Sequence, residues 1–159
     1  MNDEHLVHIG EEAFEGNKAL VVSKLPNNLV ILGTRAFNSC GDGITINQLP
    51  DSLTTLGTQC FMGCRKVVLS VFGGGNSKLT TMGYMCCRGI AKDANVTEVI
   101  INSPITLVES STYGYQTFDG AYNDNLTSFK TWSKFGYSNE SDLAVNLFTR
   151  TITSCGPII

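Results

Sequence analysis

The side chains best suited to catalysis are two histidines and six cysteines. His5 and His8 lie close to the first residue, and a nucleophilic Cys–His pair would need one of them beside a thiol. The nearest cysteine in the sequence, Cys40, lies far from both along the chain. The cysteines are Cys40, Cys60, Cys64, Cys86, Cys87 and Cys155. We therefore expect no catalytic residues and no enzyme activity.

The cysteine spacing also argues against a metal site. Cys60-x-x-x-Cys64 and the adjacent pair Cys86–Cys87 lack the Cys-x-x-Cys spacing that structural zinc favours. An even number of cysteines permits disulfides. Because several of the cysteines fall at equivalent positions of a repeat, we favour free buried thiols that pack as small hydrophobes, with disulfides as the alternative.

Other ligand classes are disfavoured by the remaining sequence. The glycine-rich segment 73–77 lacks the Lys-Ser/Thr pair and the helix of a phosphate-binding loop, so we expect no cofactor there. A net charge of −3, with 11 basic and 14 acidic residues, disfavours nucleic acid as a partner. No apolar run reaches the roughly 18 residues of a membrane helix, so we expect no membrane insertion. The acidic N-terminal stretch does not resemble an export signal.

The main signal is a phrase of the form apolar-Gly-x-x-small-Phe-x-Gly that recurs five times. Its first glycines are Gly10, Gly33, Gly57, Gly83 and Gly114, so the intervals are 23, 24, 26 and 31 residues. A coil of this length cannot bury its own apolar face, whereas stacked coils bury a continuous core. The repeat therefore predicts a solenoid of about five imperfect coils.

Short segments around each glycine predict the path of a coil. Alternating apolar residues predict strands at 20–22, 44–46, 67–69 and 99–101. A Leu-Pro pair, as at Leu25-Pro26 and Leu49-Pro50, is expected to end the strand because proline has no amide hydrogen. The spacing Leu-x-x-Leu-Gly then predicts a short helical turn with two apolar side chains on one side.

The aromatic and cysteine positions predict two ladders inside the solenoid. Phe14, Phe37, Phe61 and Phe118 occupy the same repeat position and should stack, with Cys87 as the small substitute in the fourth coil. Cys40 and Cys64 each follow their phenylalanine by three residues, which predicts a second inward position.

The order Leu-Pro-x-x-Leu-x-x-Leu-Gly-x-x-Ala-Phe-x-x-Cys over residues 25–40 resembles the BspA-like leucine-rich repeat. The resemblance is close for residues 5–72, looser for 77–126 and absent beyond about residue 130. It implies an α/β-type repeat solenoid: a right-handed coil of mostly short parallel strands, with turns and short helical segments. It also implies a non-enzymatic protein, because members are typically adhesins on bacterial and protist surfaces, and related repeats occur in phage virion proteins.

The two ends of the chain differ from the repeat. We expect residues 1–126 to form the solenoid and 127–159 to form a C-terminal cap or extension packed on the last coil. Only eight residues precede Ile9, so no N-terminal cap is expected. An uncapped coil attracts a neighbour, which predicts association through the N-terminal coil, with another copy or another subunit.

Polar residues at exposed strand positions form the first candidate contact surface. Thr45, Asn47, Gln48, Thr97 and Glu98 are expected to line the sheet face, which resembles the ligand face of the family. Polar, weakly charged surfaces suit the recognition of proteins or glycans. The alternative is a solvated face without a partner.

Aromatic residues in the last third form the second candidate surface. Tyr113, Tyr115, Tyr122, Trp132 and Tyr137 cluster there, and Tyr and Trp are favoured as interface anchors. Covering the last coil of the core is the competing use.

These observations predict a non-catalytic binding module for recognition of, or adhesion to, a protein or cell-surface glycan through the solenoid face and its loops. The alternative is a structural component of an assembly such as a phage virion, in capsid decoration, a tail or a fibre. The first places the chain at a cell surface and the second in a virion.

Overall fold

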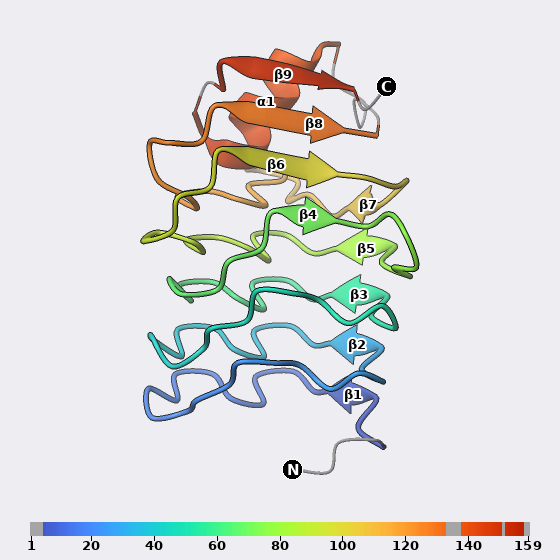
Figure 1. Ribbon diagram of the computed structural model, residues 1–159, viewed down its shortest axis with the longest axis vertical. Coiled ribbons are helices and arrows are strands. Elements are labelled where there is room, and N and C mark those ends of the chain that lie inside the picture. Colours follow the sequence, from blue (N-terminus) through green and yellow to red (C-terminus); the bar gives the residue numbers. More distant parts are fainter. Residues whose placement is uncertain (1–4, 133–137, 151, 158–159) are drawn as a thin grey trace.

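The computed structural model describes residues 5–132, 138–150 and 152–157. The chain winds as a ladder of stacked coils with a parallel sheet on each of two sides (Figure 1). The five-stranded sheet has the order β1-β2-β3-β5-β7 and consists of β1 (His8–Ile9), β2 (Ile31–Leu32), β3 (Thr55–Leu56), β5 (Thr81–Met82) and β7 (Thr106–Leu107). The four-stranded sheet has the order β4-β6-β8-β9 and consists of β4 (Val71–Phe72), β6 (Glu98–Ile101), β8 (Ser128–Thr131) and β9 (Ser154–Pro157). The predicted repeat solenoid is therefore confirmed.

The prediction of a helical turn at the Leu-x-x-Leu-Gly spacing is wrong. The apolar residue before each of the first four glycines is instead the second residue of a two-residue strand, as Leu32 is in β2. Leu32 pairs in parallel with Ile9 of the previous coil and Leu56 of the next. The backbone of Val30, Ile31 and Gly33 bonds to the previous coil instead of forming a helical turn.

The strands predicted on the other side are confirmed only in part. Residues 99–101 lie in β6, as expected. Segments 20–22 and 44–46 contribute a single isolated bridge between Val22 and Ile44. The prediction for 67–69 is wrong, because β4 begins at Val71.

The segment after each glycine carries the most regular contact between coils. In each coil, three amides donate to three carbonyls of the next coil. The amides belong to the second, fourth and sixth residues after the repeat glycine. The carbonyls belong to the first, third and fifth residues after the glycine of the next coil. Between the first two coils these bonds are Glu12 N to Thr34 O (2.8 Å), Phe14 N to Ala36 O (2.9 Å) and Gly16 N to Asn38 O (2.8 Å). The second and sixth residues adopt left-handed backbone, with φ of 55° at Glu12 and 72° at Gly16. We call this set of bonds the turn ladder.

The glycines themselves are required by close approach. A Cβ atom on Gly57 would lie 2.5 Å from the carbonyl carbon of Gly33, and one on Gly33 would lie 2.6 Å from that of Gly10. Only glycine leaves room for neighbouring coils to stack at this point.

The predicted aromatic ladder is confirmed in the first three coils. The rings of Phe14 and Phe37 stack with centroids 5.3 Å apart, and those of Phe37 and Phe61 with centroids 5.8 Å apart. Cys87 is fully buried at the fourth position. Beyond it Phe118 stacks on Phe148, with a centroid distance of 5.0 Å, so the ladder resumes toward the C-terminus.

The second inward ladder is also confirmed, and all six cysteines are free thiols. Cys40 Sγ donates to Phe14 O at 2.9 Å, and Cys64 Sγ donates to Phe37 O at 3.0 Å. Each thiol thus bonds to the carbonyl of the ladder phenylalanine in the coil before its own. Both side chains are buried.

The C-terminal end is covered by the helix α1 (Glu140–Phe148), which packs behind β8 and β9 (Figure 1). Its carbonyls take the place of a following coil: Gln116 N donates to Asn146 O (3.2 Å) and Phe118 N to Leu147 O (2.8 Å). Among the helices described, none is long and apolar enough to cross a membrane. A domain boundary at residue 126 stays a prediction, because β8 continues the sheet of β4 and β6 across it.

We predict that Gly57→Ala lowers the free energy of unfolding by about 3 kcal/mol or more, since overpacking against rigid backbone forces the coils apart. Urea denaturation followed by circular dichroism measures the change. Gly10→Ala is the matched control, because it has the same repeat position but nothing within 4 Å of the added Cβ. Its effect should stay within about 1 kcal/mol. Equal losses in the two variants would contradict the close stacking of coils.

Candidate partner-binding face

The buried thiols are poorly suited to nucleophilic chemistry. Burial raises the pKa of Cys64 to about 12 and raises the pKa values of Cys60 and Cys87 well above the ordinary value. A thiol attacks as its thiolate, so these side chains are inert at neutral pH. Across the described ranges, no group of three or more His, Cys, Asp or Glu side chains is placed to hold a metal ion.

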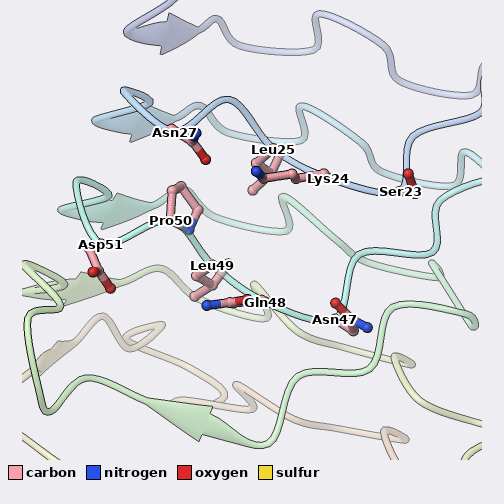
Figure 2. Close-up of a pocket in the computed structure, with 9 residues that line it drawn as sticks. All are labelled: Ser23, Lys24, Leu25, Asn27, Asn47, Gln48, Leu49, Pro50 and Asp51. Carbon is pink, nitrogen blue, oxygen red and sulfur yellow. The ribbon is translucent and has the colours of Figure 1, made fainter.

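A polar hollow opens between the first and second coils on the side of the four-stranded sheet (Figure 2). The Val22–Ile44 bridge joins the two coils. After it, residues 23–25 and 47–49 form no backbone hydrogen bonds with each other among the described residues. The resulting hollow has a volume of about 390 Å³. Its lining residues are Ser23, Lys24, Leu25, Asn27, Asn47, Gln48, Leu49, Pro50 and Asp51.

A second hollow of about 250 Å³ opens one coil further on. It lies between the segment 47–51 and the segment 69–77, which contains β4 and the loop that follows it. Asn47, Gln48, Leu49 and Asp51 line both hollows. We call the segment 47–51 the ridge, because it separates the two.

The polar side chains of the ridge, and those of Ser23 and Lys24 across the first hollow, are available to a partner. Within the described part of the chain, no hydrogen bond engages the side chains of Asn47 and Gln48, and none engages the hydroxyl of Ser23. No ion pair among the described residues engages Lys24 or Asp51, so the face carries one charge of each sign. An amide can donate and accept at once, which suits peptide groups and hydroxyls.

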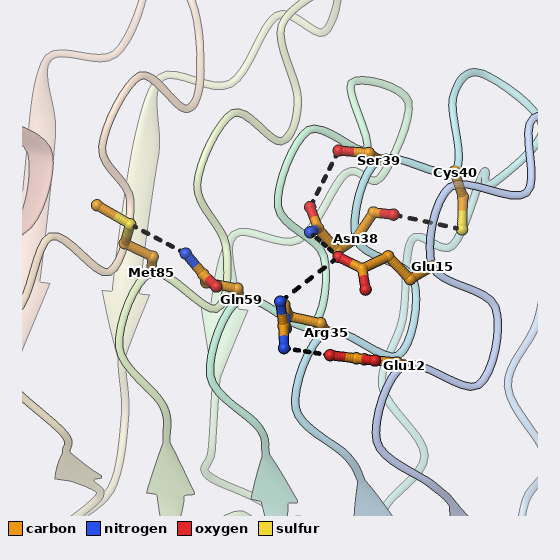
Figure 3. A network of polar contacts seen from close by, with 8 residues as sticks. All are labelled: Glu12, Glu15, Arg35, Asn38, Ser39, Cys40, Gln59 and Met85. Carbon is orange, nitrogen blue, oxygen red and sulfur yellow. Dashed lines mark hydrogen bonds and ion pairs between the residues drawn. The ribbon is translucent and has the colours of Figure 1, made fainter.

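The side formed by the turn ladder contrasts with this face (Figure 3). Arg35 pairs with Glu12 of the previous coil and lies 4.0 Å from the carboxylate of Glu15. Asn38 Nδ2 donates to Glu15 Oε1 at 2.6 Å. These polar side chains satisfy one another between coils, and less of their bonding capacity remains for a partner.

The predicted strand residues do not share one environment. Thr45, Asn47 and Gln48 are exposed, and Asn47 and Gln48 lie on the ridge. Thr97 is exposed but lies on the segment entering β6, outside both hollows. Glu98 pairs with Lys130 Nζ and accepts from Ser128 Oγ, both at 2.9 Å. The bonds from Lys130 and Ser128 lower the pKa of Glu98 and occupy its carboxylate.

The predicted aromatic surface stays a prediction, and only some of its residues are exposed. Tyr113 and Trp132 are 64% and 55% exposed. Tyr115 and Tyr122 are buried, which excludes a role as surface anchors and fits the competing use, packing in the core. The hydroxyl of Tyr122 donates to Leu69 O at 2.6 Å, which satisfies it inside the core, and burial raises its pKa. Tyr137 lies outside the described residues.

Sequence reasoning missed Lys24, Asn27 and Asp51 as members of the face. The repeated Leu-Pro phrase carries a signal for two of them, because Asn27 and Asp51 both follow a proline directly. Lys24 carries no repeat signal, since the equivalent position in the next coil is Gln48.

Comparison with known proteins gives one match. The family described as the BspA type leucine rich repeat region matches residues 2–119 in 6 copies. No curated protein and no solved structure matches the chain.

We predict that Cys155 alone reacts promptly with an aromatic disulfide reagent at about pH 8, because it is the one cysteine that is not buried. The other five should react only after urea unfolds the chain. Absorbance of the released thiolate measures both phases, and Cys155→Ser should remove the prompt one. If Cys40 or Cys64 of the folded chain reacted as fast as Cys155, the burial of these thiols in the core would be contradicted.

Proposed function

Because the chain belongs to the BspA type leucine-rich repeat family, we propose that it is a non-catalytic binding module that recognises a protein or a surface glycan. The contact surface in this proposal is the ridge with its two hollows. The observation that carries it is the unsatisfied polar character of this face, set against the internally paired turn side. In an adhesive role the face would meet its partner at a cell surface.

The backbone around the hollows adds to the argument. Where the coils diverge, the amides and carbonyls of 47–49 have no backbone partner among the described residues. A partner that supplies donors and acceptors would replace water there without leaving polar groups unpaired. The stacked core beneath holds the face rigid, which lowers the entropy lost on binding.

The composition of the two hollows favours a protein over a sugar. Neither hollow is lined by an aromatic side chain on which a sugar ring could stack. Lys24 and Asp51 instead offer charges of opposite sign, which suits a protein surface of mixed charge. We therefore place protein first and glycan second for this face.

We predict that Asn47→Ala and Gln48→Ala each weaken partner binding about tenfold, because each removes hydrogen bonds worth about 1–2 kcal/mol at a desolvated interface. Arrays of purified surface proteins and of glycans, probed with the full chain, identify the partner and measure the loss. Val108→Ala is the control, since Val108 is exposed beside β7 on the other sheet. Partner binding that is unchanged in both Asn47→Ala and Gln48→Ala would contradict the proposal that the ridge is the contact surface.

A second candidate function is a structural role in an assembly such as a virion, through the N-terminal coil. One observation favours it: the carbonyls of Glu11, Ala13 and Glu15, which begin the turn ladder, have no partner among the described residues. Gly33 N bonds to Ile9 O, so the backbone of His8 faces away from β2. The first coil thus presents an unpaired strand edge at His8, and Val21, on the other side of the same coil, is 79% exposed.

In this candidate we predict a closed dimer in which the two His8 edges pair, because the backbone of His8 offers both an amide and a carbonyl, while α1 occupies the other end of the solenoid. Light scattering across a range of concentrations should show the mass rising from 17.2 kDa toward twice that value. Val21→Lys should keep the chain monomeric, whereas Val108→Lys should not. A wild-type mass that stays at one chain at every concentration would eliminate this candidate.

A further inference from the structure

A shallow hollow beside α1 differs in chemistry from the two at the ridge. It has a volume of about 510 Å³ and is lined by Tyr113, Gln116, Asp142, Val145, Asn146 and Thr149. Val145 is 45% exposed and Tyr113 is 64% exposed, so the hollow has two apolar surfaces within a polar frame. We call it the Tyr113 hollow.

The ring of Tyr113 is presented by a tight, internally bonded turn. Ser110 and Gly114 bond to each other through both backbones, with distances of 2.8 and 3.1 Å. Ser110 Oγ also accepts from the amides of Thr112 and Tyr113, at 3.2 and 3.3 Å. The backbone that carries the ring is therefore fixed before any ligand arrives, and holding the ring in place costs little further entropy.

Two amide side chains of the hollow are oriented by hydrogen bonds to their oxygens. Gln116 Oε1 accepts from the hydroxyl of Tyr84 at 3.1 Å. Asn146 Oδ1 accepts from the amide of Tyr115 at 2.7 Å. Each bond occupies the oxygen, and no hydrogen bond within the described residues engages Gln116 Nε2 or Asn146 Nδ2. The hollow thus holds two amide donors whose orientation is set by the fold.

The charge of the lining narrows the ligand class. No Lys or Arg lines the hollow, so it offers no countercharge to a phosphate, a sulfate or a nucleic acid. Asp142 supplies the one carboxylate, and it is engaged at the start of α1. Its Oδ2 accepts from Asn139 Nδ2 at 2.8 Å, and its amide donates to Asn139 Oδ1 at 2.8 Å. A carboxylate held in a helix cap is a weak attractant for a cationic ligand.

We propose that the Tyr113 hollow binds the ring of a neutral sugar. The apolar C–H face of such a ring packs on an exposed aromatic face, which carries negative potential. The sugar hydroxyls accept from Gln116 Nε2 and Asn146 Nδ2 and donate to the free oxygen of Asp142. This site goes beyond the protein-binding role proposed for the ridge and does not depend on it.

The test is a titration of the full, isotope-labelled chain with glucose, galactose, mannose, N-acetylglucosamine, N-acetylgalactosamine and fucose. Concentrations up to about 50 mM are needed, because one shallow contact gives a Kd on the order of millimolar. At least one sugar should shift the side-chain amide signals of Gln116 and Asn146. Choline, tested as a cationic probe of similar size, should leave them unchanged.

Substitutions separate binding from folding. Tyr113→Ala should weaken sugar binding at least tenfold, while Tyr113→Phe keeps the ring and the affinity. Gln116→Glu should also weaken it, because glutamate still accepts from Tyr84 but offers no outward donor. Thr112→Ala, in the same exposed turn, is the matched control.

The outcomes are distinct from those for the ridge. The sugar site is wrong if none of the six sugars shifts the two amides, if choline shifts them and no sugar does, or if Tyr113→Ala binds as well as the unaltered chain. Asn47→Ala and Gln48→Ala should leave the sugar titration unchanged. A result that contradicts the ridge proposal therefore does not contradict the sugar site, and a result that contradicts the sugar site does not contradict the ridge proposal.

Discussion

The stacking of coils through the turn ladder is the constraint on which the rest of this structure depends. Three amides in each coil must meet three carbonyls in the next, and this requires left-handed backbone at two positions, as at Arg35 and Ser39. It also brings the glycine backbones so close that no Cβ atom fits between them. Once this spacing is set, the phenylalanine rings of the first three coils stack.

The repeat therefore allowed the core to be predicted well and the secondary structure poorly. Phe37, Phe61 and Cys64 were placed correctly, because a repeat position fixes which side chain faces inward. Most of the predicted strands were misplaced, because pairing of only two residues leaves no periodicity that a sequence can display, whereas 99–101 lies in the longer strand β6. Leu29 and Leu32 have the spacing of a helical turn, yet the bonds of Leu32 run to adjacent coils, and that choice depends on tertiary contacts. The helix α1 and strands β8 and β9 lie beyond the repeat, where no pattern was available.

The residues of the candidate binding face, like the strands, could be predicted from the sequence only in part. Asn47 and Gln48 were found because polar residues next to a strand are expected to face solvent. The hollows around them were not predictable, since they arise where two coils diverge after a single bridge. Tyr122 was misjudged because its hydroxyl has a buried acceptor, Leu69 O, supplied by a residue 53 positions away. A tyrosine whose polar end is satisfied inside a core cannot be told from a surface tyrosine by composition.

The same ladder makes the two ends of the solenoid chemically different. Amides point toward the C-terminal end, where carbonyls of α1 accept from Gln116 and Phe118, and Phe148 continues the stack. Carbonyls point toward the N-terminal end, where those of Glu11, Ala13 and Glu15 have no amide donor among the described residues. Two copies cannot join head to tail while α1 is in place, because the end that would donate is already occupied. The helix thus opposes growth into a filament, and the N-terminal coil, the ridge and the Tyr113 hollow remain the proposed contacts of the chain.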